Sequence, residues 1–370
     1  MLLDYLFSDE PDAPPDEFSL IRVSRRAMAT TFEVAIPVGT HSNPIAAAED
    51  ALDLIDDLED QMTVFRDHSE VSRLNAIAAN EFVVVESGLF ELFRRCAVWT
   101  KETGGAFDIA TGALTKAWGF YRRDGAVPPA NELIAAMRAT GFRHVVLDET
   151  HRAVKFRATG LEPNLGAVGK GYALDRAAEL LRSKWGVRSV LLHGGGSSVL
   201  AIGRPPGDDR GWPIRLTHPS QADLSLGTIR LRDAGLGTSA ATFQFFEYNG
   251  RKLGHLLDPR SGWPAVGTAS ASVTAPSAAE ADAMSTAAFV LGTEGTGPLT
   301  RLRPALGAVL LNSEDRPAPP AHSDSPSGPV SRRSRGPGEG KGEGAGALAT
   351  FNIAPDAFTL PALHGPVHAD

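Results

Sequence analysis

A long stretch without core-forming residues divides this 370-residue chain and limits where a compact domain can lie. Between Asn312 and Ala347 the sequence consists mainly of Pro, Ser, Gly, Arg and Glu, a composition that cannot build a hydrophobic core. We therefore expect residues 312–350 to form a linker and residues 19–311 to form the folded body. The acidic, proline-containing residues 1–18 predict a disordered arm, and the mildly apolar residues 351–370 predict a tail that docks back or binds elsewhere.

Charge and cysteine content narrow the function classes. A formal charge of −8, from 36 basic and 44 acidic residues, argues against a general nucleic-acid binder, because a phosphate-reading surface needs a basic excess. Cys96 is the single cysteine, so neither an intrachain disulfide nor a multi-cysteine zinc cluster can form. No apolar run approaches the roughly 20 residues that span a bilayer, and the first ten residues lack a secretory-signal pattern. We therefore expect no membrane segment and a cytoplasmic location.

The body alternates helical periodicity with hairpin signals. Apolar residues at helical spacing predict helices at 44–62, 88–101, 130–139, 169–184 and 278–290. Short apolar runs around polar turns predict a hairpin over 144–157, another around Asn249-Gly250, and strands at 190–192, 213–217 and 228–232. Hairpins mixed with helices indicate an α+β fold rather than a repeating βαβ array.

A glycine-rich loop opens directly into the helix expected at 169–184. It reads Asn164-Leu165-Gly166-Ala167-Val168-Gly169-Lys170-Gly171. Glycines let a ligand approach the backbone, and the helix start together with Lys170 favours phosphate. A P-loop would need Gly at position 164 and Ser or Thr at 171, so this loop is not one. It is a candidate pyrophosphate site, with an ordinary turn before a helix as the alternative.

A second glycine run, Gly194-Gly195-Gly196, follows His193 at the end of an expected buried strand. Such glycines are tolerable where a flat or bulky ligand presses against the main chain. A flexible turn is the alternative interpretation.

Three further patterns could carry chemistry. Asp282 and Thr286 are four residues apart on one helix face, so their oxygens could bind one Mg²⁺, although capping and solvation are the common roles of such pairs. His255, close to Asp258, could accept a proton from an attacking hydroxyl, although most isolated histidines are structural. The ring of Phe107 could stack on an aromatic ligand or serve as a buried anchor for its turn.

In this order, the motifs resemble the ApbE family of FAD:protein FMN transferases from about Met28 to Leu311. The matching blocks are Met28-Ala29-Thr30, residues 62–75, Ala106-Phe107-Asp108, Lys170-Gly171-Tyr172, the glycines from 194, His255 with Asp258-Pro259-Arg260, and the Asp282 to Thr286 helix. The resemblance implies a two-domain α+β fold with mixed or antiparallel sheets and flanking helices. It also implies that FAD binds in a cleft with Mg²⁺ on its pyrophosphate.

The resemblance implies roles for individual positions. The metal would be held by the backbone carbonyl of Ala167 and the side-chain oxygens of Asp282 and Thr286. Contacts to FAD are implied for Met28, Phe65, Ala106, Phe107, Asp108, Asn164, Lys170, Gly194 and Gly195. The chain departs from the family pattern at some positions: Ala29 stands where the family usually has Gly, Phe65 where Tyr is frequent, Asn164 for Asp, His193 for Asn, and Ser239-Ala240 for Ser-Gly.

The function implied is transfer of FMN from FAD to a Thr or Ser hydroxyl of an acceptor flavoprotein, with release of AMP. Lys170 and the cation held by Asp282 would neutralise the negative charge of the pyrophosphate, and His255 would accept the hydroxyl proton. Two alternatives stay open: an FAD pyrophosphatase that yields FMN and AMP, and a non-catalytic FAD-binding protein. The acceptor and the oligomeric state are not encoded in any recognisable pattern.

Overall fold

A computed structural model describes residues 18–122, 125–240, 245–248, 251–313 and 347–361. The expected N-terminal arm, most of the expected linker, the end of the tail and the Asn249-Gly250 turn therefore lie outside the described residues. None of the described helices is long and apolar enough to span a bilayer.

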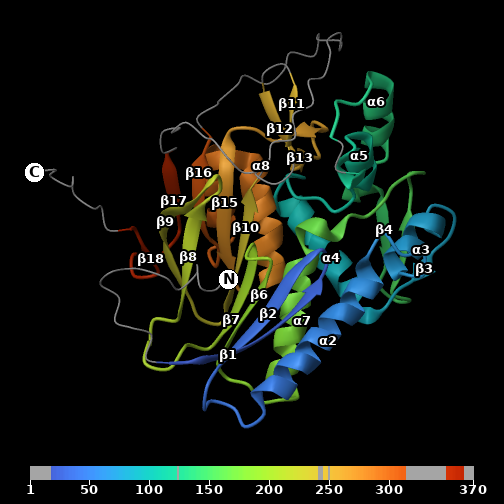
Figure 1. Ribbon diagram of the computed structural model, residues 1–370. Helices are drawn as coiled ribbons and strands as arrows, with labels where there is room; N and C mark the ends of the chain where they lie inside the picture. Colours follow the sequence, from blue (N-terminus) through green and yellow to red (C-terminus); the bar gives the residue numbers. More distant parts are fainter. Residues whose placement is uncertain (1–17, 123–124, 241–244, 249–250, 314–346, 362–370) are drawn as a thin grey trace, which may run out of the picture.

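An eight-stranded antiparallel sheet forms the centre of the fold, in the order β1-β2-β6-β7-β10-β15-β16-β17 (Figure 1). Its strands are β1 (Leu20–Ala27), β2 (Thr30–Pro37), β6 (Val190–Gly194), β7 (Ser198–Ile202), β10 (Ala234–Ala240), β15 (Thr268–Ala275), β16 (Gly307–Asn312) and β17 (Leu348–Phe351). Because the sheet is covered on both faces, its central strands are apolar on both sides: Leu192 faces one core, and Leu191 faces the other.

Helices cover one face of this sheet. α2 (Pro44–Met62), α7 (Gly169–Ser183) and α8 (Ala278–Leu302) pack on it, and α3 (Glu70–Ile77), α4 (Ser87–Glu102), α5 (Gly112–Ala117) and α6 (Ala130–Arg138) extend this layer to the side (Figure 1). The helices predicted at 44–62, 88–101, 130–139 and 169–184 are confirmed within two residues. The last helix runs beyond the expected residue 290 because the chain kinks at Gly292 and resumes helical geometry.

The other face is covered by a small sheet, β18-β9-β8, comprising β8 (Trp212–His218), β9 (Gln221–Leu231) and β18 (Phe358–Thr359). Trp212 and Ile214 are buried between this sheet and the central one. β17 comes mostly from the end of the expected linker and pairs with β16, and β18 comes from the expected tail and pairs with β9, so the folded body includes residues beyond 311.

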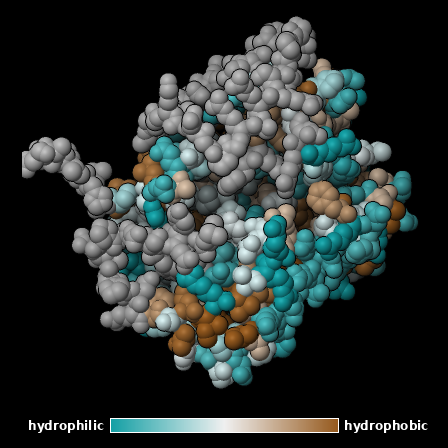
Figure 2. Space-filling view, in the orientation of Figure 1, coloured by the Kyte–Doolittle hydropathy of each residue, from teal (hydrophilic) through white to brown (hydrophobic). Residues whose placement is uncertain are grey.

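Three small sheets complete the described structure. The predicted hairpin over 144–157 is β4 (Val145–Asp148) and β5 (Ala153–Phe156), extended by β3 (Val83–Val84). β11 (Phe245–Tyr248) pairs with β12 (Arg251–Gly254), and β13 (Leu257–Asp258) pairs with β14 (Trp263–Pro264). The α+β fold class is confirmed. Figure 2 shows mainly hydrophilic side chains over α2 and α3, as expected for helices with one buried face.

Candidate active site

The glycine-rich loop leads into α7 as predicted. A short 3₁₀ turn, Leu165–Ala167, precedes the helix, and Asn164 caps it by accepting a hydrogen bond from Gly166 N–H at 2.9 Å. The N–H groups of Gly169 and Lys170 precede the first intrahelical hydrogen bond of α7, so they point out of the helix at its positive end. Ala167, Lys170 and these N–H groups lie together where an anionic ligand is favoured.

Asp282, in the second turn of α8, lies directly against this helix start. Its Oδ2 atom accepts hydrogen bonds from Gly171 N–H at 2.8 Å and from the Ser198 hydroxyl at 3.0 Å. Burial raises the pKa of Asp282, although the positive charge of Lys170 and these two hydrogen bonds act in the opposite direction. The carboxylate is therefore a buried acidic group, and an additional cation would stabilise its ionised form.

Thr286 lies one helical turn after Asp282. Its hydroxyl donates to the Asp282 carbonyl at 3.2 Å and is 3.3 Å from the Ser239 hydroxyl of β10. The described ranges contain no group of three or more His, Cys, Asp or Glu side chains that could hold a metal. A cation here would therefore use one carboxylate with hydroxyl and carbonyl oxygens. This donor set suits Mg²⁺, which binds few protein ligands and keeps waters or phosphate oxygens in its shell.

Mg²⁺ fits these residues. The structure records no hydrogen bond to Oδ1 of Asp282 from the described residues, so this oxygen is free for a metal while Oδ2 holds α7. Thr286 donates its proton to a carbonyl, and with the Ser239 hydroxyl as a second partner its oxygen still has a lone pair for a metal.

The glycine run from Gly194 lies next to the Met28-Ala29-Thr30 segment at the end of the central sheet. Gly194 is paired with Phe32 in the sheet, and Gly195 N–H donates to Thr31 at 2.9 Å. A Cβ on Gly195 would lie 2.3 Å from the Thr30 hydroxyl, and this residue has φ +64°, so packing by itself requires glycine here. Met28, two residues before Thr30, lies in the adjacent β1–β2 turn.

The 104–112 loop is held by Asp108. Its carboxylate accepts hydrogen bonds from Ala110 N–H and Phe142 N–H, each at 2.8 Å, and burial raises the pKa of this group. Ala106 and Phe107 are buried, and the Phe107 ring packs edge-on against Trp99 with centroids 6.2 Å apart. The hypothesis that the Phe107 ring stacks on a ligand is therefore wrong, because the ring has no exposed face. It is a buried anchor.

Phe65 differs in that its side chain is 76% exposed. Its ring and the ring of Tyr121 form a T-shaped pair with centroids 6.0 Å apart, and the exposure of Phe65 leaves ring surface available for an aromatic ligand. The loop that carries Phe65 ends at Ser69, which caps α3 and donates to the Thr63 carbonyl at 2.5 Å.

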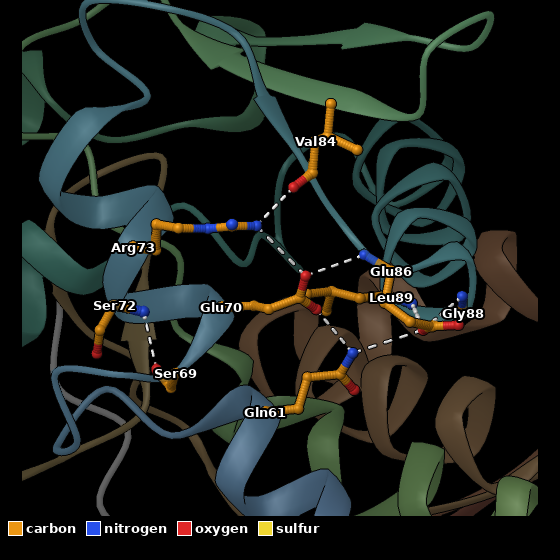
Figure 3. Close-up of polar contacts among 9 residues, drawn as sticks. All are labelled: Gln61, Ser69, Glu70, Ser72, Arg73, Val84, Glu86, Gly88 and Leu89. Carbon is orange, nitrogen blue, oxygen red and sulfur yellow. Dashed lines mark hydrogen bonds and ion pairs between the residues drawn. The ribbon is translucent and has the colours of Figure 1, made fainter.

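A polar network anchors this loop (Figure 3). Glu70 accepts hydrogen bonds from Gln61 at 2.7 Å and from Glu86 N–H at 3.0 Å, which ties together the end of α2, the start of α3 and the start of α4. Burial would raise the pKa of Glu86, but hydrogen bonds from Gly88 N–H and other donors lower it to about 2. These carboxylates are structural. They fix the base from which Phe65 projects.

His255 lies between β12 and β13, beside the ring of Phe120 at a centroid distance of 6.5 Å. Asp258 accepts hydrogen bonds from the Arg260 backbone and guanidinium at 2.8–2.9 Å, so it orients Arg260 rather than His255. The structure brings together Lys170, Asp282 and Thr286, and it places His255 beside Phe120.

Two polar groups of this region, the buried Ser198 and the half-buried Asp175, were not found by sequence reasoning. Ser198 holds Asp282 from β7, and Asp175 of α7 accepts hydrogen bonds from the first residues of α8, 103 positions later. No local spacing signals contacts over such distances.

Comparisons with known proteins agree with this geometry. The ApbE family model matches residues 28–310. The chain belongs to the ApbE family. Among curated ApbE relatives, the FAD:protein FMN transferase of Treponema pallidum is 32% identical over 285 residues, covering 73% of this chain and 78% of the relative. The Klebsiella pneumoniae protein of the same name is 31% identical over 273 residues, covering 73% and 84%.

Solved ApbE structures share the fold. The ApbE protein of Thermotoga maritima has a TM-score of 0.72 and 28% identity, over 80% of this chain and 94% of that one. The Pseudomonas stutzeri flavinyl transferase ApbE, in its apo form, has a TM-score of 0.71 and 27% identity, over 82% and 94%. The architecture described for this ApbE chain is therefore shared along nearly the full length of both solved proteins.

Proposed function

We propose that the chain transfers the FMN part of FAD to a Thr or Ser hydroxyl of an acceptor protein and releases AMP. One observation carries the proposal: the buried carboxylate of Asp282 meets the N-terminus of α7, next to Lys170 and the Thr286 hydroxyl. A pyrophosphate needs positive charge on its oxygens, and this region supplies it from a helix start and a lysine. The names of the curated relatives support the choice of FAD as donor and a protein as acceptor.

Asp282, Thr286 and the Ala167 carbonyl would hold Mg²⁺, which supplies charge neutralisation on the phosphate oxygens when bound. Lys170 and the free N–H groups of α7 orient the pyrophosphate, so that the acceptor hydroxyl approaches the FMN phosphorus in line. The exposed ring of Phe65 offers a surface for an aromatic part of FAD.

The bond changes balance without a further reactant. The acceptor oxygen forms a bond to the FMN phosphorus, and the bond from that phosphorus to the bridging oxygen breaks, so that AMP leaves with the electron pair. The hydroxyl proton passes to a base, and His255 is our candidate because an imidazole nitrogen can accept a proton. Asp258 is not the group that orients it, since Asp258 is bound to Arg260.

The test is incubation of the purified chain with FAD, Mg²⁺ and a co-expressed candidate acceptor. Transfer predicts an acceptor whose mass increases by one FMN, together with stoichiometric AMP, and no labelling when the acceptor Thr or Ser is replaced by Val or Ala. Free FMN and AMP without labelling would identify a pyrophosphatase instead. Absence of AMP under every metal condition would leave only an FAD-binding protein.

A further inference from the structure

The starts of α7 and α8 hold each other through exchanged carboxylates. Asp175, in the second turn of α7, accepts hydrogen bonds from Ala278 N–H at 2.7 Å and from Ala279 N–H at 3.1 Å. These are the first two residues of α8, whose N–H groups have no partner within their own helix. In return, Asp282 of α8 accepts from Gly171 N–H in the first turn of α7.

Close packing leaves this arrangement little freedom. A Cβ on Gly171 would lie 2.2 Å from the Ala278 carbonyl oxygen, so the two helix backbones are in direct contact. Asp175 therefore sets the position of the first turn of α8, and Asp282 follows in the next turn of the same helix.

Arg95 of α4 supports the same turn from the other side. Its guanidinium donates to the hydroxyl of Ser277, the N-cap of α8, at 2.7 Å, and lies over the Trp99 ring at 4.8 Å. Ser277 also accepts from Glu280 N–H at 3.2 Å. The start of α8 is thus held by the Asp175 carboxylate of α7 and by the Ser277 hydroxyl, to which Arg95 of α4 donates a hydrogen bond.

We propose that Asp175 is a positioning residue for the cation site: it holds the first turn of α8 so that Asp282 and Thr286 present their oxygens together. The inference rests on the proposed function, which places Mg²⁺ at these two residues. Mg²⁺ demands near-ideal octahedral geometry, so a small displacement of one ligand is costly. Loss of residues that orient metal ligands typically weakens metal affinity by about 10- to 100-fold.

The experiment compares Asp175→Asn with Asp208→Asn in the full chain. Asp208 is a matched control, because its carboxylate also accepts a backbone N–H, from Arg210 at 2.9 Å, and pairs with Arg230 at the small β8–β9 sheet. Mn²⁺ affinity is measured by electron paramagnetic resonance on the protein without FAD, and the Mg²⁺ dependence of AMP release is measured separately. We expect Asp175→Asn to weaken Mn²⁺ binding at least about tenfold, in the range known for residues behind metal ligands. AMP release should recover at high Mg²⁺, and Asp208→Asn should bind Mn²⁺ like the wild type.

Other outcomes would overturn the inference. If folded Asp175→Asn binds Mn²⁺ with wild-type affinity and only melts earlier, Asp175 is a structural cap. If Asp175→Asn does not fold, Asp175→Glu decides, because it keeps the charge but displaces it by one methylene: weaker Mn²⁺ binding supports the inference, and unchanged binding rejects it. Asp282→Asn separates the two proposals. When this variant loses Mn²⁺ and Asp175→Asn does not, only the positioning role fails, whereas absence of Mn²⁺ binding by the wild type rejects both.

Discussion

The β1–β2 turn contains backbone strain that one substitution should release. Ala27 and Thr30 are paired, so Met28 and Ala29 are the two central residues of the turn, with φ +50° and +61°. This is the left-handed geometry of a type I′ hairpin, which usually carries Asn-Gly. A residue with a Cβ costs about 1–2 kcal/mol in this region. The exposed methyl of Ala29 gains little packing in return.

Ala29→Gly should therefore stabilise the protein. Removal of the strain is partly offset by the greater freedom of glycine in the unfolded chain, about 0.4–1 kcal/mol. The net gain in the free energy of unfolding is then about 1 kcal/mol, which corresponds to a rise in melting temperature of about 1.5 °C for a folded body of about 300 residues. The resemblance gives glycine as the usual residue at this position, so the backbone conformation of Met28 should not change.

Urea unfolding and calorimetry of the full chain measure the effect, and Ala135→Gly provides the control. Ala135 is exposed inside α6, where glycine should destabilise by about 1 kcal/mol, so the same chemical change has opposite signs at the two sites. If Ala29→Gly lowers the free energy of unfolding as Ala135→Gly does, the reasoning from backbone strain is refuted.

Three further predictions concern the site, acid stability and the tail. Asp282→Asn keeps an acceptor for Gly171 N–H and the Ser198 hydroxyl, so stability should fall little, but loss of the charge should abolish AMP release. Asp282→Ala leaves these two buried donors unpaired and should lower the free energy of unfolding in urea by roughly 3 kcal/mol. Burial and the charge of Arg22 lower the pKa of His193 to about 4. The neutral imidazole therefore stabilises the folded state above pH 6.5, and this stabilisation declines as the pH falls toward 4. Between pH 7 and pH 5 the free energy of unfolding of the wild type should fall by about 2 kcal/mol more than that of His193→Asn. Asn312 N–H donates to the Ala347 carbonyl at 3.1 Å, so replacement of residues 313–346 by Asn-Gly should close a tight hairpin. The shorter loop should raise the free energy of unfolding by about 2 kcal/mol and leave FAD cleavage unchanged. A fall in stability or activity would show that the replaced residues contribute to the fold or the site.

Local patterns predicted the helices well, because the burial of one face leaves a period in the sequence. α2 and α7 start and end within two residues of their expected bounds. The order of the central sheet was not predictable in this way. β2 pairs with β6, more than 150 residues later, and β17 reaches the sheet across a low-complexity stretch, so neither pairing leaves a local signal.

The candidate site shows the same division. The glycine-rich loop and the Asp282 to Thr286 spacing were visible in the sequence because each lies within one turn or one helix. The hydrogen bonds that unite them, from Gly171 to Asp282 and from Ala278 to Asp175, cross more than 100 residues and follow only from packing of α7 against α8. For Phe107 the sequence left stacking and anchoring open, because a buried aromatic anchor and an exposed stacking residue have the same neighbours in sequence.

Two departures from the pattern that the resemblance implies, Asn164 and Phe65, fall where the surrounding atoms tolerate them. Asn164 uses both sides of its amide: its oxygen accepts from Gly166 N–H, and its nitrogen donates to the Thr115 hydroxyl at 3.3 Å, a bond that an ionised Asp could not donate. Phe65 lacks a hydroxyl, but its side chain is largely exposed, so the missing group leaves no buried partner unsatisfied at that position. Asp282 has neither form of compensation, since its carboxylate is buried and already accepts hydrogen bonds from two donors on separate elements. Asn164 and Phe65 thus have local compensation, whereas the contact between two helix starts and the proposed cation depend on Asp282.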